Sequence, residues 1–107
     1  NPAACSLVSV CSMSDVHPAR MYWMNDDELT PILSEYETSR RQDIPPAYYR
    51  NGSIYITRAE AFARTGSMMS KPAVGYLMPS DHLLNIDDTR DIIIAESLIS
   101  AWKNGII

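Results

Sequence analysis

Hydrophobic positions along the chain fall into short runs that predict alternating strands and helices. The run CSLVSVCSM (5–13) is short and rich in Val, Leu and Cys, as in a buried strand, and SIYI (53–56) and AVGYLM (73–78) predict two more strands. The clearest helix is predicted over 87–105, with Asp88 at its N-cap and a glycine at its end. Its apolar stripe has helical spacing and consists of Ile92, Ala95, Leu98, Ile99 and Trp102.

A shorter helix is predicted over 58–64. Thr57 and Glu60 have the spacing of a capping box, and Gly66 suits the position after the last helical turn. This helix separates the last two predicted strands, and the connection is long enough for a parallel crossover between them. The order strand, helix, strand, helix predicts an α/β fold.

The middle of the chain has a different character. Two short apolar runs within 19–33 flank the polar residues 25–27, which predicts a hairpin. Segment 34–50 is mixed polar with two consecutive prolines, which exclude helix and central strand, so we expect a loop or an extended excursion. The following Asn51-Gly52 is typical of a type I′ turn. Local sequence leaves open whether this turn also presents a ligand-binding group.

Length and charge limit the classes of function. A chain of 107 residues, 46% of them hydrophobic, suits one domain. The net charge of -4 disfavours nucleic acid and membranes as partners, and no apolar run approaches the ~20 residues that span a bilayer. Cys5 and Cys11 would lie about 20 Å apart on one strand, which excludes a disulfide, so we expect reduced cysteines in a cytoplasmic protein.

Two groups of charged residues are candidates for chemistry. Asp87, Asp88 and Asp91 lie at the predicted start of the longer helix, where they either cap the helix or bind a divalent cation such as Mg²⁺ through carboxylate oxygens. The basic residues of H-P-A-R (17–20) and R-R-Q (40–42) either form a solvated surface or capture a carboxylate, which a planar guanidinium group can bind through two hydrogen bonds. No G-x-S-x-G, Walker loop or G-x-G-x-x-G is present, and the isolated histidines do not indicate zinc.

Three longer strings stand in a fixed order: LVSVCSMSDVHPARM, RRQDIPPAYYRNGSIYI and GYLMPSDHLLNIDDTRDIIIAESLI. Together they resemble the C-terminal half of the acylneuraminate cytidylyltransferases, which are the CMP-sialic acid synthetases and their relatives for bacterial nonulosonic acids. The resemblance covers roughly residues 5–100. Its specific part is R-Q-x-x-P followed by N-G-x-I-Y-I and I-D-x-x-x-D.

The resemblance implies a fold and an activity. The chain (1–107) would be one partial domain, the C-terminal part of a Rossmann-like nucleotidyltransferase fold, with a β-rich excursion at 14–50 for dimerisation and for capping the sugar site. The family transfers CMP from CTP to a nonulosonic (sialic-type) acid and releases pyrophosphate, with Mg²⁺ offsetting the charge on the phosphates. Its members are homodimers.

The resemblance also implies sugar-binding residues. Arg41 and Arg20 would contact the sugar carboxylate, and Asn51 and Tyr55 would contact the sugar itself. Met68 and Met69 stand where an aromatic pair lines the N-acyl pocket of sialic acid enzymes. Methionines there favour a reshaped pocket for another nonulosonic acid, such as a legionaminic- or pseudaminic-like acid.

Asp87 matches the second acid of the family's D-I-D motif and would be the catalytic Mg²⁺ ligand. The first acid of that motif is Asn85, whose neutral amide lowers the negative charge of the site. The loop that binds the CTP phosphates in the family has no match in this sequence. We therefore expect a piece of a longer protein that is inactive alone. The alternative is a non-catalytic, self-associating interaction module with the same fold elements.

Overall fold

A computed structural model describes residues 2–107 and divides the chain into two compact units. One unit combines the residues up to Cys11 with Arg50–Ile107, and the other is Ser12–Tyr49. The limits of the second unit lie within two residues of the excursion expected at 14–50. Because each unit has its own internal contacts, each is described by itself.

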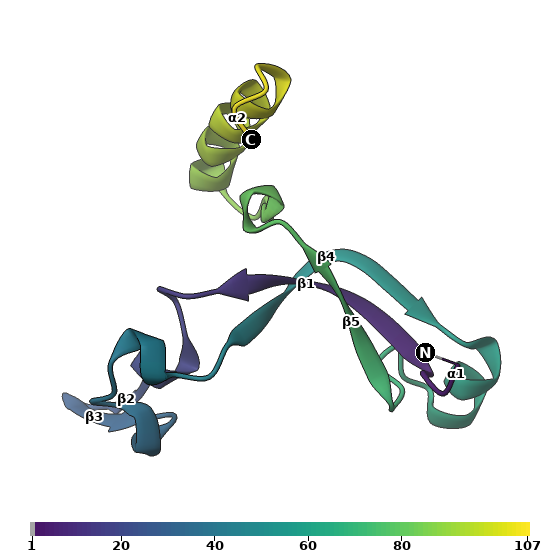
Figure 1. Ribbon diagram of the computed structural model, residues 1–107, viewed down its shortest axis with the longest axis horizontal. Helices are drawn as coiled ribbons and strands as arrows, with labels where there is room; N and C mark the ends of the chain where they lie inside the picture. Colours follow the sequence, from purple (N-terminus) through teal and green to yellow (C-terminus); the bar gives the residue numbers. More distant parts are fainter. Residues whose placement is uncertain (1) are drawn as a thin grey trace. The chain divides into compact units, whose positions relative to one another are not determined.

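The first unit is built on a three-stranded sheet of order β4-β1-β5 (Figure 1). Strands β1 (Ser6–Met13) and β5 (Ala73–Met78) are parallel, with register from Ser6 opposite Ala73 to Cys11 opposite Met78. Both strands match the apolar runs in the sequence. The structure is therefore a mixed α/β fold, as predicted.

Strand β4 (Ala47–Thr57) lies on the other side of β1. The backbone N–H of Arg58 donates to the Cys5 carbonyl, and the N–H of Ile54 donates to the Ser9 side chain. These pairs run in opposite sequence order, so β4 is antiparallel to β1. The expected parallel crossover between β4 and β5 is wrong, because the parallel partner of β5 is β1.

The predicted type I′ turn at Asn51-Gly52 is also wrong. Both residues lie inside the eleven-residue strand β4, and only Gly52 has a positive φ, of 79°. A single left-handed glycine within a strand is typical of a bulge, which shifts the alternation of side chains without reversing the chain. The sequence signal was real, because Asn-Gly does mark positive φ here. It marks an irregular strand instead of a turn.

Helix α1 (Ala59–Thr65) begins without the predicted capping box. Its N-cap is Arg58, which makes no side-chain cap, and the Thr57 hydroxyl instead donates to the Met68 carbonyl at 2.6 Å. Gly66 ends the helix in the left-handed conformation (φ 69°), as predicted. A long-range hydrogen bond has therefore replaced the local one at the start of this helix.

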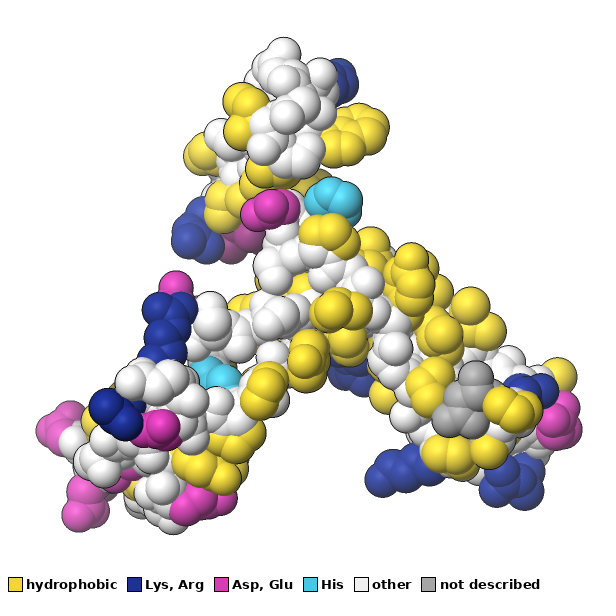
Figure 2. Space-filling model, in the orientation of Figure 1, with side chains coloured by type: hydrophobic (Ala, Val, Ile, Leu, Met, Phe, Trp, Pro, Cys, Tyr) yellow, Lys and Arg dark blue, Asp and Glu magenta, His cyan; other side chains and the backbone are white. Residues whose placement is uncertain are grey.

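Helix α2 (Thr89–Lys103) has the predicted N-cap at Asp88, and Asp91 completes a capping box with it. Of the apolar stripe, only Ala95 is buried, whereas Trp102 is 61% exposed. Figure 2 shows hydrophobic side chains on the surface of this unit. The helix therefore forms as predicted, but its apolar face finds no cover within the described residues.

The second unit contains a two-stranded antiparallel sheet, β2 (Tyr22–Asn25) and β3 (Glu28–Pro31), joined at Asp26, which has a φ of 53°. The hairpin predicted around residues 25–27 is confirmed. A hydrogen bond to the Glu37 carboxylate raises the pKa of Tyr22 above its usual value. The segment expected as a loop or an extended excursion at 34–50 contains two short 3-10 helices up to residue 46, whereas residues 47–50 already belong to strand β4.

The buried hydrophobic residues are small, and they are Val8, Cys11, Ala19, Ala61 and Ala95. Cys5 and Cys11 are both free thiols, which confirms that they form no disulfide. Across residues 2–107, no helix combines the length and the apolar character that a membrane crossing requires.

Candidate functional site

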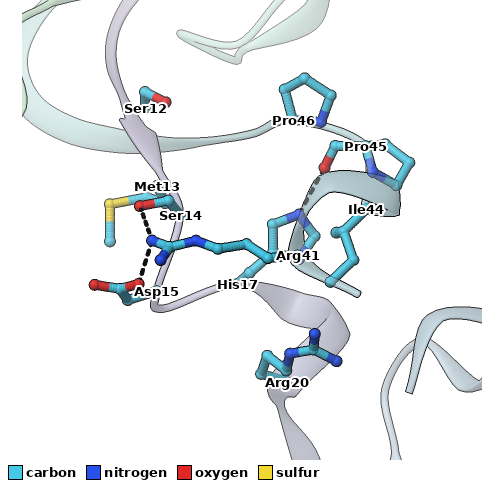
Figure 3. Close-up of a pocket in the computed structure, with 10 residues that line it drawn as sticks. All are labelled: Ser12, Met13, Ser14, Asp15, His17, Arg20, Arg41, Ile44, Pro45 and Pro46. Carbon is cyan, nitrogen blue, oxygen red and sulfur yellow. Dashed lines mark hydrogen bonds and ion pairs between the residues drawn. The ribbon is translucent and has the colours of Figure 1, made fainter. Parts of the chain in front are cut away.

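A cavity in the second unit brings together the two arginines that the sequence singled out. It has a volume of about 400 Å³ and is lined by Arg20 and Arg41 together with residues 12–15, His17 and 44–46 (Figure 3). Two guanidinium groups at one cavity make it a candidate anion site, because guanidinium groups pair with carboxylates and phosphates.

His17 holds two sides of this cavity together. Its ring is buried, Nδ1 accepts from the Ala19 backbone N–H at 2.9 Å, and Nε2 lies 2.8 Å from the Pro45 carbonyl oxygen. Since Nδ1 is an acceptor, Nε2 carries the proton and donates to Pro45. His17 is thus a clamp between segments 28 residues apart, a role that no sequence pattern indicated.

Arg41 begins the short 3-10 helix Arg41–Asp43, and it lines the cavity with a side chain that is mostly exposed. Its Nη2 donates to Ser14 Oγ at 3.0 Å and forms an ion pair with the Asp15 carboxylate. Figure 3 shows the guanidinium group of Arg41 reaching toward these two residues. Both side chains of the ion pair are mostly exposed, so water and ions have access to it.

The guanidinium group of Arg20 is held by backbone carbonyl groups. Its Nη1 donates to the Glu37 carbonyl at 3.0 Å, and its Nη2 donates to the Ser39 carbonyl at 2.6 Å. These bonds tie the 37–39 segment to the 3-10 helix Pro18–Arg20 that precedes β2, and they give Arg20 a structural role. Its positive charge still adds to the potential of the cavity, because carbonyl oxygens do not neutralise a guanidinium group.

The structure places Asn51 in the first unit, in a buried polar cluster of the sheet. Its side chain is 3% exposed, and Oδ1 accepts from the Ser9 hydroxyl at 2.5 Å and from the Ser53 N–H at 3.1 Å. Its Nδ2 lies 3.4 Å from Met78 Sδ. These contacts occupy the amide within the sheet, where it links all three strands.

Asn85 and Tyr55 lie near this cluster but on the surface. Asn85 Oδ1 approaches Gly52 so closely that an added Cβ there would lie 3.4 Å away. Tyr55 is exposed, and the guanidinium carbon of Arg50 lies 6.0 Å from its ring centre. Arg50 and Tyr55 are five positions apart, so their side chains would point to opposite faces of a regular strand. The bulge at Gly52 shifts this alternation and accounts for their contact.

Asp87 lies just before α2. Its backbone N–H donates to the Asp91 carboxylate at 2.9 Å, and that carboxylate also accepts from the Asp88 N–H. The carboxylates of Asp88 and Asp91 are therefore both used in capping, which leaves the exposed Asp87 carboxylate and the Asn85 amide as oxygen donors. Within residues 2–107, no group of three or more His, Cys, Asp or Glu side chains is arranged to hold a metal ion.

Met68 and Met69 lie at the other end of the sheet. They precede β5, whereas Asn85 and Asp87 follow it, and the six residues of β5 extend about 20 Å. Within the first unit, the predicted site residues therefore fall at two ends of the sheet: Asn51 and Asn85 at one end, and the two methionines at the other. The two arginines belong to the second unit and share its cavity.

The cavity also contains residues that sequence analysis missed. His17 begins the H-P-A-R string (17–20), and Asp15, the ion-pair partner of Arg41, lies two residues before it, but neither carried a sequence signal of its contacts. Ser9 did carry one, because a lone serine in the apolar run LVSVC needs a buried partner.

Comparisons with known proteins relate the chain to one kind of enzyme. No protein-family model matches the sequence. The chain is 31% identical over 88 residues to the N-acylneuraminate cytidylyltransferases of Streptococcus agalactiae serotype V, serotype III and serotype Ia. The matched region covers 79% of this chain and 21% of each relative, so the chain spans about a fifth of the length of the curated relatives it matches.

The buried amide of Asn51 predicts a stability effect. Asn51→Ala removes the 2.5 Å acceptor of the buried Ser9 hydroxyl, which keeps only a 3.4 Å contact with the Ile54 carbonyl, and an unsatisfied buried group costs about 1–3 kcal/mol. We expect the free energy of unfolding, measured by urea titration, to fall by at least ~1 kcal/mol. The control is Asn25→Ala in the exposed strand β2, where little change is expected. Equal effects of the two substitutions would contradict the role of the cluster.

Proposed function

Because the chain is related to acylneuraminate cytidylyltransferases along 79% of its length, we propose that it is part of an enzyme that transfers CMP from CTP to a nonulosonic acid. In this proposal the chain supplies groups that recognise the sugar acid, and the CTP phosphates bind elsewhere in the longer protein. The absence of a glycine-rich phosphate loop from this sequence supports that division. The 107 residues alone are then inactive.

The observation that carries the proposal is the pair of arginines at one cavity. A nonulosonic acid differs from most sugars by its carboxylate, and a guanidinium group binds a carboxylate through two parallel hydrogen bonds. Arg41 presents its guanidinium group at the mouth of the cavity, and Arg20 adds positive charge beside it. Carboxylate binding is therefore the step of the reaction to which the described residues are best suited.

Other features of the proposal rest on the family relationship. The sheet of the first unit is part of a Rossmann-like domain, and residues 14–50 are an excursion that contacts a second subunit and caps its sugar site. Asn51 acts by holding the sheet in register beside Tyr55, which offers an exposed hydroxyl and ring. Met68 and Met69 line the N-acyl pocket, and their flexibility suits a nonulosonic acid other than N-acetylneuraminate.

Mg²⁺ would be held mainly by Asp87. The donors fit a weak site, because one carboxylate and the Asn85 amide provide few ligands and little charge. Mg²⁺ sites that use one or two carboxylates complete their coordination with substrate phosphates and water. When bound, the ion offsets negative charge on the phosphates. The role of Asp87 is to hold the ion just before α2.

Substitution of Arg41 tests the carboxylate site. Loss of a charge-assisted hydrogen bond costs about 1.5–3 kcal/mol, so Arg41→Ala should weaken binding of the sugar acid by roughly tenfold to a hundredfold. The measurement is an NMR titration of the chain with N-acetylneuraminic acid and a legionaminic-type acid.

Arg40→Ala is the matched control, because Arg40 is the neighbouring arginine but pairs with Asp43 and does not line the cavity. It should bind like the unmodified chain. If Arg41→Ala also binds normally, Arg41 does not recognise the carboxylate and the proposed site is wrong.

Asp87 has its own test in a full-length cytidylyltransferase that contains these residues. Asp87→Asn removes the one carboxylate left for the metal, so we expect a higher Mg²⁺ concentration for half-maximal pyrophosphate release and a rate at least tenfold lower. The control is Asp81→Asn, because Asp81 is an exposed aspartate in the preceding 3-10 helix Ser80–His82. An unchanged Mg²⁺ dependence would reject the metal role.

A second candidate function is self-association through the β2–β3 hairpin. Its residues are almost all exposed, and they include Trp23 (68% exposed), Met24 and Leu29. Exposed aromatic and methionine side chains on one small element are typical of protein interfaces. Such a module needs no bound nucleotide. The chain could self-associate in this way both as part of the enzyme proposed above and without any enzymatic role.

The hairpin predicts a dimer that depends on Trp23. Interface tryptophans often contribute 2 kcal/mol or more, so Trp23→Ser should weaken dimerisation about thirtyfold. Light scattering after size-exclusion chromatography measures the change. Trp102→Ser is the control, since Trp102 is similarly exposed but lies on α2. A monomeric unmodified chain at micromolar concentration, or a loss caused only by Trp102→Ser, would refute the hairpin interface.

A further inference from the structure

Asp15 is bound where an incoming carboxylate would have to bind. Its carboxylate pairs with Nη2 of Arg41, and the same nitrogen donates to Ser14 Oγ. Asp15 also lines the cavity, next to the strand end at Met13. Of the ionisable groups that line the cavity, Asp15 is the carboxylate, whereas Arg20 and Arg41 are positively charged.

The geometry of a guanidinium group makes this pairing consequential. A carboxylate can bind arginine through two hydrogen bonds side-on, with Nε and Nη2, or end-on, with Nη1 and Nη2. Both arrangements use Nη2. That nitrogen carries two N–H groups, and its two recorded bonds go to Ser14 and Asp15. A ligand carboxylate therefore binds Arg41 bidentately only after Ser14 or Asp15 has moved away, and of these two Asp15 is the charged competitor.

We propose that Asp15 is an internal competitor for carboxylates at Arg41, an inference that rests on the carboxylate site proposed above. With Asp15 bound, Arg41 is held at the mouth of the cavity and its charge is offset. A carboxylate ligand displaces Asp15 and takes over its hydrogen bonds. Because both partners are mostly exposed, the ion pair is weak and its displacement is easy.

This competition sets a threshold for ligands. A ligand that forms one hydrogen bond to Arg41 gains no more binding free energy than is lost when Asp15 leaves. A bidentate carboxylate with further contacts through its sugar gains more binding free energy than is lost. Asp15 would thus favour a sugar acid over small anions such as chloride or acetate. Its role is to tune the specificity of Arg41, without participation in the chemical step.

Asp15→Asn tests the competition directly. The amide is close in size to the carboxylate but is neutral, so Arg41 is left more available and the repulsion of an incoming carboxylate is removed. NMR titration should show binding of N-acetylneuraminic acid or a legionaminic-type acid about threefold to tenfold tighter, with little change for the neutral methyl esters. Asp43→Asn is the matched control, because it removes the same charge from an exposed arginine pair outside the cavity lining.

A second measurement needs no sugar. Phenylglyoxal modifies accessible guanidinium groups, and peptide mass spectrometry gives the rate for Arg41. Asp15→Asn should raise that rate severalfold and leave the rate for Arg40 unchanged, whereas Asp43→Asn should affect Arg40. An unchanged Arg41 rate overturns the inference whether or not any sugar acid binds.

The two proposals fail in different ways. If the unmodified chain binds the acid and Asp15→Asn binds it equally or more weakly, competition is refuted while the carboxylate site stands. If no variant binds either acid but Asp15→Asn exposes Arg41 to phenylglyoxal, the ion pair shields Arg41 as inferred. The proposal of a sugar-acid site is then refuted. Circular dichroism of each variant confirms that the fold is retained, as expected for an exposed aspartate.

Discussion

The sheet unit depends on one buried hydrogen bond, between the hydroxyl of Ser9 and the side-chain amide of Asn51. Ser9 is fully buried in the central strand, where an unpaired hydroxyl would be costly. It accepts from the Ile54 N–H as well, so the pairing of β1 with β4 is held in a single register. A slip by one residue would leave both polar groups without partners and would turn every side chain of β4 to the other face.

That register explains the position of the surface residues nearby. The left-handed Gly52 lets the Ser53 N–H return to the Asn51 side chain, and the extra residue brings Arg50 over the ring of Tyr55. Because Gly52 has no side chain, Asn85 can also approach the strand closely. The groups proposed to face the sugar are thus arranged by a polar contact in the interior of the sheet.

Elements with local signals were predicted well from the sequence, and elements that depend on distant contacts were not. Strands β1 and β5, the hairpin and the Asp88 cap of α2 each follow from residues close together in the chain. The turn at Asn51 failed because its amide finds Ser9, 42 residues away. At the candidate site, the importance of Arg41 could be proposed from its motif. Its partner Asp15 and the clamp between His17 and Pro45 join segments 26 and 28 residues apart, which no local pattern reveals.

Ligand binding at the cavity and association through the exposed hairpin depend on different interactions, although both features belong to the second unit. Recognition of a carboxylate depends on the direction of a few hydrogen bonds, and before a ligand binds, Ser14 and Asp15 hold the guanidinium group of Arg41 in place through contacts inside the unit. Association through apolar side chains depends on buried area, which a single hairpin supplies only when it meets a partner. Salt weakens an exposed ion pair such as that of Arg41 with Asp15, while it leaves apolar association unaffected or strengthens it. The two properties of this unit can therefore be separated by ionic strength, without any substitution.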